Sequence, residues 1–252
     1  MDRDSLERAR SFLKDSIRLT IDFSQTDQSR GVPAPPLEKP FDPQARRIRL
    51  PRPEEWTSIA PIDLRTAIAS RRSHRQFRRE MLSLEELAFL LWATQGIRGR
   101  AGPTSAYRTV PSAGCRHALE TYLAVLNVAG LEEGIYRYLP VEHELLFEFA
   151  EENLGEKVAA AALGQTFVGR GAVTLIWTAI PYRMEWRYGL ASHKVIALDA
   201  GHVCQNLYLA CAAIGAGTCA IAAYDQEAMD RLLRLDGKEE FVIYLAPVGK
   251  VG

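Results

Sequence analysis

The spacing of apolar residues changes along this chain and separates predicted strands from predicted helices. Three runs over 119–128, 134–140 and 143–149 are rich in β-branched and aromatic residues and have short, turn-rich connections. They are predicted to form an antiparallel meander. The run 172–180 is apolar almost throughout, which is typical of a buried central strand, and 241–250 predicts a final strand.

Apolar residues also recur at helical spacing. The clearest helix begins at Ser83, which forms a capping box with Glu86, and ends near Gly96. The longest helical pattern covers 194–215 and stops at Gly215. Shorter elements are predicted as helices over 4–19, from Pro61 toward 73, over 153–164 and over 225–237, and as a strand over 218–223. A mainly antiparallel central sheet flanked by helices defines the α+β class.

The first 60 residues differ from the rest of the chain. Residues 31–43 hold five prolines, and proline fixes φ and removes an amide donor. We therefore divide the chain into an N-terminal helix with a proline-rich extended arm, residues 1–60, and a main domain, residues 61–252. The arm is expected to lie over the main domain or over a partner subunit, with a disordered linker as the alternative.

Composition narrows the classes of protein. The 252 residues are 47% hydrophobic, enough for a sizeable core. Lys and Arg total 31, as do Asp and Glu, and zero net charge argues against nucleic-acid binding through the overall field. The charged start has no apolar signal region, and no run of about 18 apolar residues could cross a membrane. The four cysteines form no C-x-x-C pair, so we expect reduced core thiols, a cytoplasmic protein and no metal site.

A cluster of arginines is the main candidate for chemistry. The stretch SRRSHRQFRR, residues 70–79, holds five arginines. Guanidinium groups bind phosphate oxygens in pairs, and a serine hydroxyl can add a further bond. The predicted phosphate site consists of Arg71, Arg72, Ser73 and Arg75. A solvated basic face and a nucleic-acid patch are the alternatives, while GAGTCA at 215–220 follows a helix and so lacks the context of a dinucleotide fingerprint.

Four blocks occur in order along the chain: RRSHRQF, PSAGCRH, DAGHVCQNLYLACAAIGAGTCAIAAYD and YLAPVGK. Together they resemble the FMN-dependent nitroreductase family, and more closely its azoline-dehydrogenase branch, the SagB or thiazole/oxazole oxidase type. The resemblance covers roughly residues 62–251. It implies the nitroreductase-like fold, an intertwined homodimer with FMN at the subunit interface, and NADH or NADPH as the electron donor.

The resemblance also assigns FMN contacts. The phosphate and the ribityl chain would be held by Arg71, Arg72, Ser73 and Arg75, completed by Lys250. The P-S motif, which reaches the flavin from the neighbouring subunit, would be Pro111, Ser112, Ala113 and Gly114. The backbone passing along the isoalloxazine near N5 would be Ala220, Ile221, Ala222 and Ala223. Taken without the resemblance, the last segment is a tight helix–strand joint, and Lys250 is a solvated end charge.

A residue pair bears on the mechanism. In the azoline-dehydrogenase branch a Lys-Tyr pair is assigned to proton handling, and the matching positions here are Arg187 and Tyr188. Arginine stays protonated in proteins and is a poor general base. This departure weighs against azoline oxidation and leaves flavin binding untouched. Arg187 could instead orient an anionic substrate or the nicotinamide donor, or be a surface cation beside Glu185.

The leading hypothesis is an FMN-dependent oxidoreductase. Hydride would pass from NAD(P)H, or from a substrate, to the flavin and then to a small electrophile such as a nitro compound or a quinone. The alternatives are an azoline or heterocycle dehydrogenase that acts on a modified peptide or small molecule, and a non-catalytic FMN-binding protein. The expected partners are a small-molecule substrate and a second copy of the chain, without nucleic acid or membrane.

Overall fold

A seven-stranded antiparallel sheet forms the centre of the protein in a computed structural model that describes residues 2–102 and 104–252. The strand order is β1-β6-β5-β4-β7-β9-β8, and every neighbouring pair is antiparallel. The strands are β1 (Arg47–Arg49), β4 (Leu119–Val125), β5 (Gly134–Leu139), β6 (Glu144–Phe149), β7 (Val173–Ala179), β8 (Ala216–Thr218) and β9 (Phe241–Lys250). The predicted antiparallel meander, central strand and final strand are confirmed.

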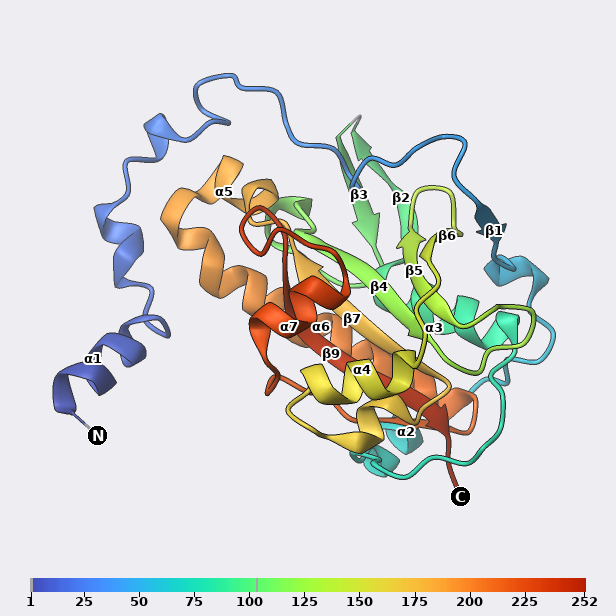
Figure 1. Cartoon of the computed structure of the whole chain (residues 1–252). Helices are drawn as coiled ribbons and strands as arrows, with labels where there is room; N and C mark the ends of the chain where they lie inside the picture. Colours follow the sequence, from blue (N-terminus) through green and yellow to red (C-terminus); the bar gives the residue numbers. More distant parts are fainter. Residues whose placement is uncertain (1, 103) are drawn as a thin grey trace.

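The sheet is covered on both faces because side chains alternate along each strand. On β7, Leu175 and Trp177 belong to one hydrophobic core, while Ile176 between them belongs to a second. The first core also contains α3 (Leu84–Gln95) and α6 (Ser192–Ala213). The second contains α4 (Leu154–Ala161) and α7 (Gln226–Leu232). Figure 1 shows α4 and α7 in front of the sheet and the long α6 crossing behind it.

The starts of the helices predicted from Ser83 and Asp225 are confirmed. Ser83 Oγ accepts a hydrogen bond from the Glu86 amide at 3.1 Å, and the Glu86 carboxylate accepts one from the Ser83 amide at 2.9 Å. Asp225 caps α7 through the Ala228 amide at 2.9 Å. These bonds satisfy amide groups that a first helical turn would otherwise leave free. The short helix α2 (Leu64–Ser70) also begins on an aspartate cap, Asp63, and leads into the arginines.

Three elements lie in segments without a clear sequence signal. The strands β2 (Ile97–Gly102) and β3 (Ser105–Arg108) form a hairpin where the sequence predicted no strand. In β3 the buried side chains are Ala106 and Arg108, while Tyr107 is exposed. An inward arginine reverses the usual pattern of polarity and hides the alternation on which strand prediction depends. The helix α5 (Tyr182–Tyr188) was likewise not predicted.

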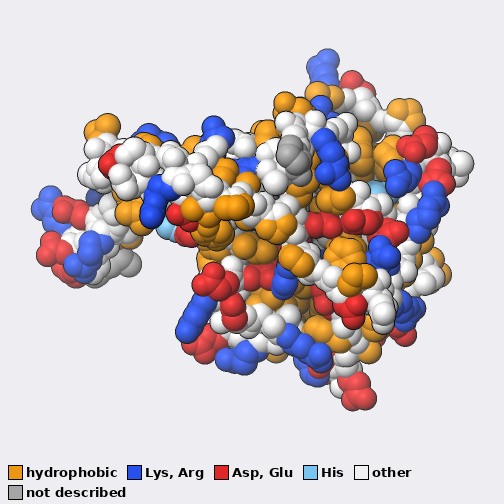
Figure 2. All heavy atoms as spheres, turned by 90° about the horizontal axis from the view of Figure 1, so that it is seen from above, with side chains coloured by type: hydrophobic (Ala, Val, Ile, Leu, Met, Phe, Trp, Pro, Cys, Tyr) orange, Lys and Arg blue, Asp and Glu red, His pale blue; other side chains and the backbone are white. Residues whose placement is uncertain are grey.

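The prediction of one helix over 4–19 is wrong. The structure has α1 (Arg3–Ser11), then a separate short 3-10 helix over Ser16–Thr20. Neither buries a side chain, and Phe12 and Leu13 are 51% and 71% exposed. Without a packing face, local propensity alone must hold the helix, and short isolated helices are marginal in water. Figure 2 shows this segment projecting from the body, with both signs of charge at its end.

The proline-rich segment lies along the domain of its own chain. The carbonyl oxygens of Leu37 and Lys39 accept hydrogen bonds from the buried guanidinium groups of Arg108 and Arg137, each at 2.8 Å. The Lys39 amide donates to the Glu120 carboxylate at 2.8 Å. A backbone with few amide donors is thus satisfied through its carbonyl groups. Farther along, Ile48 and its neighbours in β1 pair with β6.

The cysteines are free thiols, as predicted. Cys204, Cys211 and Cys219 are buried, and burial raises the pKa of the Cys204 thiol to about 12. Cys115 is half-buried.

Among the helices that the structure describes, none combines the length and the apolar character that a membrane crossing requires.

Candidate functional site

The arginine segment lies against the edge formed by β8 and β9. The His74 amide donates to the Thr218 carbonyl at 2.9 Å, and the Arg78 amide donates to the Lys250 carbonyl at 2.8 Å. Glycine makes this approach possible, since a Cβ at Gly217 would lie 2.5 Å from the His74 ring and one at Gly249 would lie 2.9 Å from Phe77 Cβ. These glycines therefore let the segment lie close to the sheet.

Tyr208 of α6 joins this segment to the small-residue segment that follows β8. Its hydroxyl accepts a hydrogen bond from the Ala220 amide at 2.9 Å and shares a second with Ser73 Oγ at 2.9 Å. The Arg71 guanidinium carbon lies 5.3 Å from the centre of the Tyr208 ring. Sequence reasoning missed Tyr208, although a tyrosine hydroxyl in an otherwise apolar helical run needs a hydrogen-bond partner and was a usable signal.

The arginines carry positive charge that the described residues do not neutralise. Arg71, Arg72 and Arg75 are exposed, and none has a carboxylate within 4.0 Å in the described chain. Burial and the nearby Arg72 lower the pKa of His74. Arg71 and Arg72 line a pocket of about 600 Å³. Free guanidinium groups around such a hollow can bind an anion.

Lys250 is directed elsewhere. Its ammonium forms an ion pair with Glu86, the capping residue of α3, and donates to the Ile214 carbonyl at 2.6 Å. Both side chains of the pair are largely buried, at 14% and 16% exposed. The phosphate role of Lys250 stays a prediction, and this ion pair argues against it.

Replacing Lys250 with methionine is expected to lower stability by about 2 kcal/mol, because Glu86 would lose its cation while remaining mostly buried. FMN affinity is expected to stay near the wild-type value. Urea unfolding and an FMN titration on the same variant check both parts. A large loss of FMN affinity at wild-type stability would restore Lys250 to the phosphate site.

The segment 220–223 is divided between core and surface. The Ile221 side chain is buried in the second core, and its amide and carbonyl pair with Leu245 at 2.8 and 3.1 Å. Ala222 and Ala223 are exposed, and the Ala223 carbonyl accepts a hydrogen bond from Gln165. Of the four predicted residues, Ala220 is the one that Tyr208 links to Ser73.

The P-S-A-G loop and the Arg187–Tyr188 pair meet at Gly114. Gly114 has a φ of +59°, and a Cβ there would lie 2.7 Å from the Tyr188 hydroxyl and 2.9 Å from Arg187 Cδ. Both the left-handed backbone and the close contact require glycine. The pair stands at the end of α5, where Gly189 also has positive φ. Glu185, which the sequence suggested as a partner of Arg187, forms an ion pair with His193 instead.

Two buried residues, His117 and Asp199, lie beside the P-S-A-G loop. The His117 amide donates to Ser112 Oγ at 3.0 Å. On α6, burial raises the pKa of the Asp199 carboxyl group against the opposing effect of the nearby Ser112 hydroxyl and Ala113 amide. Asp199 Oδ2 has no partner in the described chain. Sequence reasoning missed Asp199, which was visible as a single carboxylate in an apolar helical run.

The stability of the protein should fall as the pH drops below about 6.5. Burial and the nearby Arg108 lower the pKa of His117 to about 3, so the unfolded chain binds this proton over a range where the folded chain does not. Between pH 7 and pH 5 this one group should cost about 2 kcal/mol. Replacing His117 with glutamine should remove that part of the slope in urea unfolding. An unchanged slope would contradict the assignment.

The arginine segment and the P-S-A-G loop lie beside different faces of α6. Tyr208, Cys211 and Ala212 line the pocket beside the arginines. Asn206, Leu209 and Ala213 line another pocket, whose rim includes Pro111 and Ser112. Among the described residues, Ile62 alone lines both. The arginines and the P-S-A-G loop of one chain therefore lie on opposite sides of one helix.

Sequence and structure comparisons relate this chain to known proteins. The nitroreductase family profile matches residues 68–250. A nitroreductase-family protein of Methanocaldococcus jannaschii is 34% identical over 203 residues, which cover 81% of this chain and 96% of that protein. A nitroreductase-family crystal structure from Ralstonia eutropha superposes with a TM-score of 0.68 at 26% identity, covering 87% of this chain and 99% of that one.

A more distant relative is a trifolitoxin-processing protein of Rhizobium leguminosarum biovar trifolii. It is 29% identical over 133 residues, which cover 51% of this chain and 36% of that protein.

From the family profile and the first relative, the chain belongs to the nitroreductase family, whose members are oxidoreductases. Its fold is the nitroreductase-like α+β fold.

Proposed function

We propose that the protein is an FMN-dependent oxidoreductase that transfers hydride from NADH or NADPH to a small electrophilic acceptor. The observation that carries the proposal is the group of three exposed arginines without carboxylate partners in the described chain. They stand beside Ser73 in a segment that Gly217 and Gly249 allow to lie close to the sheet. FMN carries a phosphate dianion, which such a group would neutralise.

The residues present fit the cofactor. Arg71, Arg72 and Arg75, with Ser73, would hold the phosphate and ribityl chain. The exposed Ala222 and Ala223 would leave room for the ring, since neither has a side chain beyond Cβ. Bound FMN would supply the hydride acceptor and donor, while the protein supplies binding, orientation and electrostatics.

A second copy of the chain would complete the site. The P-S-A-G loop lies on the opposite side of α6 from the arginines, so its proposed contact with flavin needs a partner chain. The outward face of α6 is suited to such a contact, because Ala197, Leu198 and Gly201 are exposed there and Leu198 is 56% exposed. Sedimentation equilibrium should give a dimer mass. A monomer that binds FMN tightly would contradict the shared site.

Tyr188 and Arg187 are the proposed catalytic pair. Tyr188 would exchange a proton through its hydroxyl beside Gly114, and Arg187, whose guanidinium carbon lies 5.4 Å from the centre of the Tyr188 ring, would orient an anionic group of the substrate or nicotinamide. Arginine keeps its proton, so it does not act as the base.

Anaerobic stopped-flow reduction tests the function. The flavin of the purified protein should lose its visible absorbance when NADH or NADPH is added, because reduction changes its electronic state. A nitroaromatic or a quinone should then restore the colour. Flavin that stays oxidised with both donors would contradict the proposal.

A heterocycle dehydrogenase is the second candidate. The similarity to a protein named for trifolitoxin processing favours it, whereas arginine at position 187 argues against it. This candidate predicts flavin reduction by an azoline-containing peptide in the absence of nicotinamide. The same stopped-flow experiment with such a peptide separates the two candidates, and persistent colour with every donor would leave a non-catalytic flavoprotein.

A further inference from the structure

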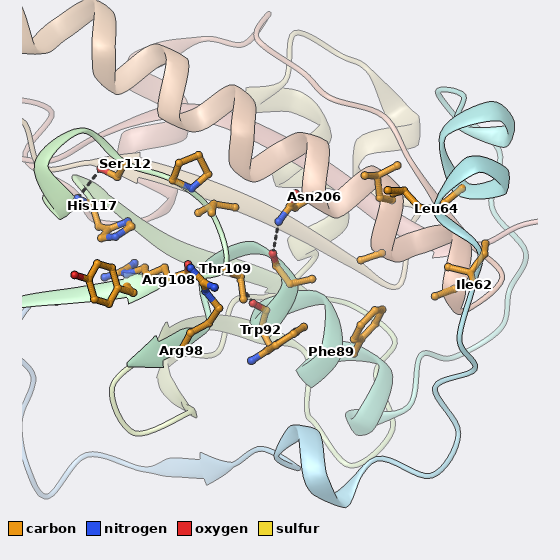
Figure 3. Close-up of a pocket in the computed structure, with 18 of the residues that line it drawn as sticks. Ile62, Leu64, Phe89, Trp92, Arg98, Arg108, Thr109, Ser112, His117 and Asn206 are labelled. Atoms are coloured by element: carbon orange, nitrogen blue, oxygen red, sulfur yellow. Dashed lines mark hydrogen bonds between the residues drawn. The ribbon is translucent and has the colours of Figure 1, made fainter. Parts of the chain in front are cut away.

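The pocket on the P-S-A-G side of α6 has two chemically different ends. Its volume is about 750 Å³, which suits a small organic molecule. Figure 3 shows Ile62 and Leu64 at one end and Arg98 and Arg108 at the other, with Trp92 between them. The function proposed above uses only the rim of this pocket.

The apolar part of the pocket can hold a flat ring. Phe89 and Trp92 of α3 lie on one side, and Leu209 and Ala213 of α6 also line it. Leu64 of α2 lines the same part and is 63% exposed. Covering such side chains with an apolar ligand is favourable, in proportion to the area removed from water.

The other end is positively charged. Arg98 Nε donates to the Arg108 carbonyl at 3.0 Å, while its terminal nitrogens have no acceptor among the described residues. Arg108 is 4% exposed; its terminal nitrogens bond to Gln95 and to the Leu37 carbonyl, but its Nε has no acceptor in the described chain. No acidic residue occurs among the described residues that line the pocket.

We propose that this pocket binds an aromatic carboxylate, with the ring beside Trp92 and the carboxylate at Arg98. Arg98 would then determine specificity, because its terminal N–H groups match a carboxylate and lose that match with a neutral analogue. Arg108 adds charge at the same end from a buried position. The inference rests on the proposed function only where it makes this ligand a substrate of the flavin.

Direct binding without nicotinamide tests the inference. The probes are 4-nitrobenzoate and 4-nitrobenzamide, which have nearly the same shape and differ in charge. Isothermal titration calorimetry on the full-length protein should give tighter binding of the benzoate. The Arg98→Gln variant should weaken benzoate binding by about tenfold, the effect of one charge-assisted contact at a partly exposed site, and leave benzamide binding unchanged.

Two further variants locate the site. Arg100→Gln removes an exposed arginine of the same hairpin that does not line the pocket, and it should retain the preference for benzoate. Leu64→Ala should weaken both probes alike. The inference is overturned if Arg98→Gln keeps the preference, if Arg100→Gln loses it equally, or if Leu64→Ala affects neither probe. Failure of flavin reduction would contradict the proposed function and would not alter these binding results.

Discussion

Replacing Arg71 or Arg75 with alanine is expected to release FMN from a protein that remains folded. Each guanidinium would contribute charge-assisted hydrogen bonds to the phosphate, and losing one should cost roughly 1.5–3 kcal/mol, or about tenfold to a hundredfold in affinity. Both side chains are exposed, and neither pairs with a carboxylate in the described chain. The fold should therefore lose little stability.

A fluorescence titration of FMN measures this affinity, and urea unfolding in the absence of added FMN measures stability. Arg79→Ala is the matched control, since Arg79 is exposed in the same segment. It lines neither the pocket beside Arg71 and Arg72 nor the smaller one beside Arg75. FMN affinity at the wild-type level in both the Arg71 and Arg75 variants would show that the phosphate lies elsewhere. An equal loss in the Arg79 variant would indicate a general effect of charge.

Replacing Glu120 with glutamine is expected to give the largest loss of stability, about 3–5 kcal/mol. Glu120 on β4 is 3% exposed and forms ion pairs with Arg183 and Arg137, both nearly fully buried. The two arginines lower the pKa of its carboxyl group against the opposing effect of burial. Removal of this charge would leave two buried guanidinium groups without their shared anion.

Urea unfolding at neutral pH measures the effect. Glu227→Gln is the control, because its ion pair with Arg231 is an exposed pair on α7 and should contribute less than about 0.5 kcal/mol. Glu120 also accepts a bond from the Lys39 amide, so the variant should expose residues 37–40 to proteolysis before the rest of the domain. Equal stability in the two variants would contradict this account of the buried network.

Much of the sheet could be predicted because its strands are rich in β-branched and aromatic residues and are joined by short, turn-rich connections. The run that became β7 is apolar apart from Thr174 and Thr178, since each of its faces contacts a hydrophobic core. The capping box at Ser83 and the stop at Gly215 are local signals and needed no tertiary information. The hairpin at residues 97–108 could not be predicted in this way, because one of the two side chains that β3 buries is an arginine.

The candidate site shows the same division. The arginine cluster was visible as a run of charge, and the glycines and small residues were visible as a pattern shared with a family. That Lys250 pairs with Glu86, and that Tyr208 links Ser73 to Ala220, depends on segments distant in sequence. Contacts of this kind leave no periodic trace, because only one residue of each element takes part.

By itself, the sequence determined the α+β class, the capped start of α3, the antiparallel sheet and the residue types able to hold a phosphate. These follow from local periodicity, capping chemistry and charge. Only the tertiary structure decided that the arginines and the P-S-A-G loop lie on opposite sides of α6. It also decided that buried arginines hold the proline-rich segment and that Arg98 stands at one end of an apolar pocket. The physical reason is that a side chain's partner is set by which elements pack together, and packing depends on the whole chain at once.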